Sequence, residues 1–124
     1  MKRVIATPDA PKAVGPYSQA IEVNGTLYIS GQIPVNPADG TVQEEITAAA
    51  HQSLKNIGAI LREAGMTYDN VVKTTVLLAD IADFKAVNEV YAEYFTGDKP
   101  ARACYQAAAL PLGVKVEIEA IAVR

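Results

Sequence analysis

The chain has 124 residues, half of them apolar, which is enough for one domain with a hydrophobic core, and we expect that domain to span residues 1–124. Its 14 Asp and Glu residues outnumber its 11 Lys and Arg residues, so the composition argues against nucleic acid as the main ligand. No signal peptide and no apolar run of about 20 residues is visible, so we expect a cytoplasmic protein that does not enter a membrane.

The chain contains one cysteine, Cys104, and one histidine, His51. A single cysteine cannot form an intrachain disulfide. A zinc or iron site would need almost only carboxylate ligands, so we expect no metal. We expect His51 to be a solvated helix residue. Cys104 would be a nucleophile only beside a base or a cation, and nothing in the sequence places His51 near it, so a buried thiol is the preferred interpretation.

The first 40 residues alternate between β-prone segments and loops rich in proline and glycine. Asn24-Gly25 separates two β-prone segments and favours a type I′ hairpin turn, in which both central residues have positive φ. Prolines and glycines interrupt the chain on either side of this hairpin. We therefore expect three short strands, at residues 4–6, 21–23 and 27–29, with loops at residues 7–16 and 31–40.

A helix is expected next, because apolar residues recur every three or four positions from residue 46 to residue 64. Thr41 and Glu44 have the spacing of a capping box, in which each side chain satisfies a free backbone N–H at the start of a helix. Gly65 suits the left-handed conformation that often ends one.

The remaining elements are three strands and a second helix. Residues 71–79 are rich in β-branched side chains and apolar on both faces, which is typical of a central strand. Asp83 is expected to cap the second helix and Gly97 to end it, with Phe84, Val87, Tyr91 and Tyr94 as its apolar stripe. The last two strands are expected at residues 101–107 and 114–123. The order β-β-β-α-β-α-β-β predicts an α+β sandwich with two helices on one face of a mixed sheet.

The last expected strand has two different faces. Val114, Val116, Ile118, Ala120 and Ala122 share one face, which should meet the helices. Two helices cover only one face of a sheet, yet the other face carries Ile121 and Val123. A half-apolar face is a common protein interface, so we expect a homo-oligomer that buries it.

Arg102 stands at the start of a small, apolar strand, on the same face as Cys104. A guanidinium stays charged and can hold a carboxylate with two parallel hydrogen bonds. Position alone supports two interpretations equally: an anion clamp, or a structural salt bridge to Glu117 or Glu119.

Glu117 and Glu119 lie on the strand face that we expect to be buried between subunits. A desolvated carboxylate there would have a raised pKa, which makes it a candidate acid or base. An interfacial ion pair with Lys115 or Arg102 is the interpretation that the residues alone favour. Tyr17, in an irregular loop, either reaches into a pocket or packs against the fold.

Five segments of the sequence resemble the reactive-intermediate deaminase (RidA, YjgF) family, in order and with family-like spacing. They are residues 15–20 (GPYSQA), 30–34 (SGQIP), 83–91 (DFKAVNEVY), 100–104 (PARAC) and 116–120 (VEIEA). The resemblance implies a chorismate-mutase-like fold and a homotrimer in which the sheets form an inner barrel and three clefts lie between subunits. It also implies hydrolysis of 2-imino and 2-enamino acids, such as 2-aminoacrylate and 2-aminocrotonate, to 2-keto acids and ammonia.

The resemblance implies a role for each site residue and no cofactor. Arg102 would hold the substrate carboxylate, Glu117 would position or activate water, and Tyr17 would shape the cleft. The remaining site residues implied are Gly31 and Cys104, through backbone groups, with Ser30 and Asn88 supporting the pocket. The implied partners are small 2-imino and 2-keto acids, with a functional link to the pyridoxal-phosphate dehydratases that release them.

Two other functions are compatible with the sequence. The first is a non-catalytic regulatory trimer that senses a keto acid through Arg102, although Glu117 opposite the clamp favours catalysis. The second is a ribonuclease or translation inhibitor, against which the acidic composition argues. Ala103 and Tyr105 depart from the family pattern, and the loop before Pro100 looks short, which leaves the size preference of the pocket open.

Overall fold

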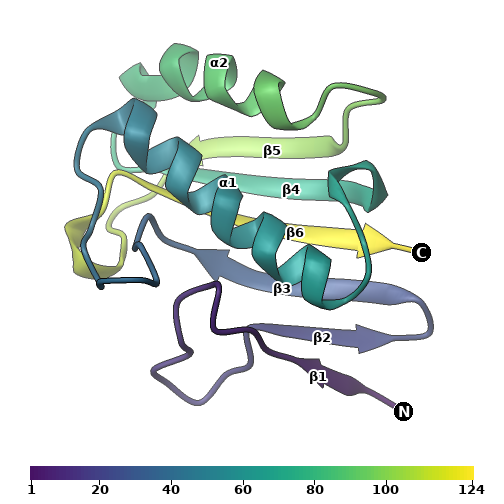
Figure 1. Cartoon of the computed structure of the whole chain (residues 1–124). Helices are drawn as coiled ribbons and strands as arrows, with labels where there is room; N and C mark the ends of the chain where they lie inside the picture. Colours follow the sequence, from purple (N-terminus) through teal and green to yellow (C-terminus); the bar gives the residue numbers. More distant parts are fainter.

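A computed structural model describes all 124 residues as two layers, a six-stranded sheet with both helices on one face (Figure 1). The strands are β1 (Arg3–Ile5), β2 (Ala20–Val23), β3 (Thr26–Gln32), β4 (Val71–Leu78), β5 (Ala101–Gln106) and β6 (Val116–Val123), and the helices are α1 (Ile46–Glu63) and α2 (Phe84–Tyr94). The predicted order of elements and fold class are therefore confirmed. Neither helix is long and apolar enough to cross a bilayer.

The strand order in the sheet is β1-β2-β3-β6-β4-β5. All neighbouring strands are antiparallel except β4 and β5, which run parallel because α2 carries the chain back between them. The last strand of the sequence therefore lies in the middle of the sheet, between β3 and β4 (Figure 1). β1 and β5 are the two edge strands, so one side of β5 has no strand partner.

The core lies between the sheet and the helices, and β6 shows how the alternation of side chains builds it. Val116, Ile118, Ala120 and Ala122 are at most 3% exposed and join the core cluster, as predicted. On the opposite face Glu117 is half-buried and Glu119 is exposed. Full burial of one apolar side chain stabilises a fold by about 1.5–3 kcal/mol. The apolar face of β6 therefore holds the helices against the sheet.

The hairpin prediction is confirmed, and so is the left-handed end of α1. Asn24 and Gly25 have φ angles of 51° and 79°, and Gly65 has a φ of 73°. A left-handed residue with a side chain costs free energy, and Asn bears this conformation better than most residues. This turn sets the register of β2 against β3.

The predicted helix caps are wrong in detail. α1 begins after Glu45, whose carboxylate accepts hydrogen bonds from the backbone N–H groups of Thr47 and Ala48, so Thr41 and Glu44 form no capping box. The chain cannot turn helical earlier because Val42 still pairs with Val35 as an antiparallel bridge.

The ends of α2 also differ from the prediction. Asp83 occupies the N-cap position without a side-chain hydrogen bond. Asp80 instead accepts from the N–H of Ala82 and caps the short 3₁₀ turn that leads into the helix. α2 ends at Tyr94, before Gly97.

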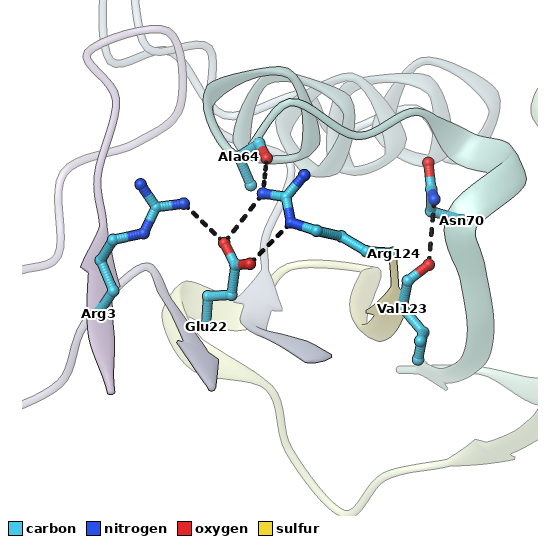
Figure 2. Close-up of polar contacts among 6 residues, drawn as sticks. All are labelled: Arg3, Glu22, Ala64, Asn70, Val123 and Arg124. Atoms are coloured by element: carbon cyan, nitrogen blue, oxygen red, sulfur yellow. Dashed lines mark hydrogen bonds and ion pairs between the residues drawn. The ribbon is translucent and has the colours of Figure 1, made fainter. Parts of the chain in front are cut away.

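Glu22 on β2 ties both ends of the chain to the fold (Figure 2). Its carboxylate accepts hydrogen bonds from Arg3 at 2.7 Å and from Arg124 at 2.9 and 3.1 Å. Arg124 also donates to the carbonyl of Ala64, just beyond α1. The bonds from Arg124 and Arg3 lower the pKa of Glu22 from 4.5 to about 2, because they stabilise its charged form.

Candidate functional site

The side chain of Arg102 reaches from β5 to α2. Its Nη1 donates a hydrogen bond of 2.7 Å to Oδ1 of Asn88. The guanidinium carbon lies 4.8 Å from the ring centre of Tyr91 and 5.4 Å from that of Phe84. No carboxylate of the chain lies within ion-pair distance, so Arg102 forms no salt bridge to Glu117 or Glu119 within one chain. We call these four residues the Arg102 half-site.

The Arg102 half-site holds a positive charge without an anion. A guanidinium has five N–H donors, and only one hydrogen bond from it is made within the chain. The two aromatic faces attract the cation and limit its orientation, but they do not neutralise it. A half-buried cation with free donors in a fixed fork is suited to bind an anion, and its geometry matches that of a carboxylate.

Cys104 lies beside Arg102 on β5, and both are in register with buried positions of β4, Thr74 and Val76. The N–H of Ala107 bonds toward β4, and backbone groups alternate along a strand, so those of Arg102 and Cys104 point to the free edge of β5. Burial raises the pKa of the Cys104 thiol, which keeps it protonated. Its backbone, rather than its sulfur, is therefore the group available to a ligand.

Glu117 forms a second cluster, at the start of β6 and on the sheet face away from the helices. Its carboxylate lies directly against Gly31 of β3, where a Cβ would be 2.9 Å from the Glu117 Cδ atom. Burial, with a smaller contribution from the charge of Glu119, raises the pKa of Glu117 above its usual 4.5. A carboxylate held in this way is suited to take up and release a proton.

Ser30 precedes Gly31 on β3, and Tyr17 lies in the loop before β2. The Ser30 hydroxyl donates a 2.6 Å hydrogen bond to the carbonyl of Ser18, which holds the loop of Tyr17 against β3. The Tyr17 side chain is 52% exposed and lines a groove with Gly31 and Leu112. The groove has a volume of about 330 Å³. We call Tyr17, Ser30, Gly31 and Glu117 the Glu117 half-site.

Two buried amide side chains shape the loops around this groove, and sequence analysis did not single them out. Gln19 is 5% exposed and hydrogen-bonds both backbone groups of Thr7 and the carbonyls of Ala10 and Pro11. Asn56 on α1 is 1% exposed and donates to the carbonyls of residues 33 and 35. An amide in a loop or helix gives no local signal of contacts that form only after folding.

The two half-sites do not meet within one chain. Arg102 is in register with Thr74 and faces the helices, whereas Glu117 is in register with Leu77 and faces away from them. Two strand spacings and three residues along the strand place their Cα atoms about 14 Å apart. A single protomer therefore cannot place both side chains on one small molecule.

The chain holds no cluster of three or more His, Cys, Asp or Glu side chains suited to a metal ion. The polar partner of His51 is Tyr94, whose hydroxyl lies 2.7 Å from the His51 Nδ1 atom. The two half-sites offer a guanidinium, a carboxyl group, a phenol and backbone amides.

Comparison with known proteins agrees with the family resemblance of the five sequence segments. The family model described as endoribonuclease L-PSP matches residues 7–124. The chain is 57% identical to the mouse 2-iminobutanoate/2-iminopropanoate deaminase, over all of this chain and 93% of that protein. Two solved structures from Escherichia coli superpose with a TM-score of 0.96 and cover 98% of both chains: the YjgF gene product, 47% identical, and TdcF with bound serine, 42% identical. The chain therefore belongs to the endoribonuclease L-PSP family, the same reactive-intermediate deaminase (RidA, YjgF) family that its motifs resemble.

Proposed function

We propose that this protein is a deaminase that hydrolyses short 2-imino acids and their enamine tautomers to 2-keto acids and ammonia. The observation that carries the proposal is the Arg102 guanidinium, a half-buried cation whose N–H donors lack an acidic partner in the chain. A 2-imino acid supplies that partner in its carboxylate. The name of the mouse relative gives the same reaction.

The substrate carboxylate binds the free edge of the Arg102 guanidinium. Asn88 occupies one N–H of Arg102, and other donors stay available for a carboxylate. The backbone at Cys104 lies on the same strand edge, where it can donate to a substrate oxygen or nitrogen. A charge-assisted hydrogen bond contributes about 1.5–3 kcal/mol, which is on the order of ten- to a hundredfold in rate if it is fully used in the transition state.

Glu117 acts on the water that attacks the imine carbon. The water oxygen adds to C2 as Glu117 accepts one water proton and passes it to the imine nitrogen, which gives a neutral carbinolamine. Glu117 then takes the proton of the C2 hydroxyl and delivers it to the nitrogen as the C2–N bond breaks, so ammonia leaves and the C2–O bond becomes the ketone. The raised pKa of Glu117 suits both steps, because the group must accept and then donate the same proton.

The half-sites come together between subunits in this proposal. The helices leave the sheet face of Ile121 and Val123 uncovered, and the Cα atoms of Arg102 and Glu117 lie about 14 Å apart within one chain. A second copy of the chain can cover that face and bring its own Glu117 close to Arg102. In a homotrimer each cleft would combine the Arg102 half-site of one subunit with the Glu117 half-site of its neighbour. Light scattering at micromolar concentration tests this assembly, and a monodisperse monomer would contradict it.

The decisive experiment is a coupled assay. A pyridoxal-phosphate threonine dehydratase generates the imine, semicarbazide competes for it, and semicarbazone formation is followed with and without this protein. We expect semicarbazone to fall with increasing protein while dehydratase turnover stays unchanged. No effect from well-folded protein would refute the deaminase proposal, and binding of 2-ketobutyrate by that protein would indicate a keto-acid sensor.

A further inference from the structure

A buried polar pair lies behind the Arg102 half-site. The hydroxyl groups of Thr74 on β4 and Tyr91 on α2 are 2.7 Å apart. Thr74 is fully buried and Tyr91 is 6% exposed. The Tyr91 ring also packs against Phe95, with 4.5 Å between ring centres. The ring is therefore held both at its hydroxyl end and across its face.

The Tyr91 ring in turn holds the Arg102 guanidinium, whose central carbon lies 4.8 Å from the ring centre. The hydrogen bond to Asn88 fixes one nitrogen of the guanidinium. The centre of the Phe84 ring lies 5.4 Å from the guanidinium carbon. One hydrogen bond alone leaves a long arginine side chain free to rotate about it. A ring in a fixed position removes that rotation.

We propose that Tyr91 is a positioning residue for substrate binding, with Thr74 as its anchor in the core. The inference rests on the proposed role of Arg102 as the carboxylate clamp. In this arrangement the Thr74 hydroxyl fixes the angle of the Tyr91 ring, the ring fixes the plane of the guanidinium, and the free N–H donors face the substrate before it arrives. Binding then costs less side-chain entropy, because the fork is already oriented.

A purely structural role explains the apolar packing of Tyr91 but not its polar pair. Phenylalanine and valine would fill the same space at these two positions without any buried hydroxyl to satisfy. Burial raises the pKa of the Tyr91 phenol, so the hydroxyl stays neutral and serves as a hydrogen-bonding anchor.

Tyr68 provides a matched control for removal of a buried tyrosine hydroxyl. It donates a 2.7 Å hydrogen bond to the carbonyl of Leu54 and packs edge-on against Phe95, but it does not contact Arg102. Tyr68→Phe therefore removes one hydroxyl from the same aromatic cluster. Any general loosening of the helix layer should appear in both Tyr68→Phe and Tyr91→Phe.

The first test measures dissociation constants for 2-ketobutyrate, the reaction product that keeps the carboxylate. We expect the constant to rise about threefold in Tyr91→Phe and Thr74→Val and about tenfold in Tyr91→Leu, and to stay at the wild-type value in Tyr68→Phe. In an Arg102→Ala background the Tyr91 substitutions should weaken binding no further. Equal weakening in Tyr68→Phe and Tyr91→Phe, or a Tyr91 effect that persists without Arg102, would overturn the proposal.

The second test needs no ligand and so separates this proposal from the proposed function. The Nε–H signal of Arg102 in a ¹⁵N NMR spectrum reports the order of the guanidinium. We expect a low-mobility signal in the wild-type protein and in Tyr68→Phe, and a mobile one in Tyr91→Leu. An unchanged Arg102 signal in Tyr91→Leu would overturn the positioning role. A signal that responds as expected in a protein that binds no 2-ketobutyrate would instead refute the clamp role of Arg102.

Discussion

The Glu117 carboxylate rests on the bare Cα of Gly31, so closely that a methyl group at position 31 would collide with it. This contact joins β3 to β6 on the sheet face away from the helices. We expect Gly31→Ala to push the carboxylate aside and to lower deaminase activity at least about tenfold, because a small displacement of a reacting group is costly. The semicarbazide-coupled assay measures the loss.

A suitable control for this substitution is Gly97→Ala. Gly97 has no positive φ, and apart from its chain neighbours the only atom within 4 Å of a Cβ added there is a carboxylate oxygen of Asp69, at 3.8 Å. We expect this variant to keep wild-type activity. The outcome that contradicts the Gly31 prediction is a folded Gly31→Ala protein with activity equal to that of Gly97→Ala.

Arg102→Ala should lose most activity, because nothing else in the half-site carries a positive charge for the substrate carboxylate. The activity of Arg102→Lys should also fall, since an ammonium group cannot reproduce the planar fork of the guanidinium. We expect the oligomer to persist in both variants, as measured by light scattering. Arg62→Ala, an exposed change on α1, serves as the charge-matched control. Arg102→Ala activity within about threefold of wild type would remove Arg102 from the clamp role.

Glu117→Gln should separate turnover from binding. The amide keeps the size of the carboxyl but cannot accept the proton of water, so we expect turnover to fall while 2-ketobutyrate still binds. In the wild-type protein, activity that needs the carboxylate should disappear as the pH falls through the raised pKa of Glu117, which lies above the usual 4.5. Loss of binding along with turnover would show that Glu117 is a binding group instead.

The same pKa shift predicts a sign for stability. A carboxyl whose pKa is raised on folding disfavours the native state once the pH exceeds the pKa of the unfolded chain, because it then ionises more readily in the unfolded state. Glu117→Gln removes that penalty. We therefore expect its melting temperature at pH 7 to equal or exceed that of the wild type, and a clear decrease would contradict the assigned cause of the shift.

Glu22 should contribute stability with the opposite pH dependence. Its pKa of about 2 lies below the value of 4.5 for the unfolded chain, so its bonds to Arg124 and Arg3 stabilise the fold above pH 4.5 and lose effect as the pH falls toward 2. We expect Glu22→Gln to lower the melting temperature at pH 7 and to approach the wild type in acid. Glu44→Gln, at an exposed residue without an ion pair, is the control. A difference between Glu22→Gln and wild type that is the same at pH 7 and pH 2 would contradict this prediction.

Local patterns in the sequence predicted most of the secondary structure. The alternation along β6 predicted which face meets the helices, and Asn24-Gly25 predicted the hairpin turn, because neighbouring residues decide both. The start of α1 was predicted too early, at the residues after Thr41. A bridge between Val35 and Val42 keeps that segment extended, and such a pairing is not visible in a helical pattern.

The sequence by itself determined the order of elements, the apolar face of the sheet, and, through the family motifs, the candidate site residues. Only the tertiary structure decided what those residues touch. It placed β6 in the centre of the sheet, seated Arg102 on Asn88 and Tyr91 instead of on Glu117, and put the two half-sites on opposite faces. These outcomes depend on contacts between segments far apart in the chain, whereas periodicity and turn chemistry report only on near neighbours.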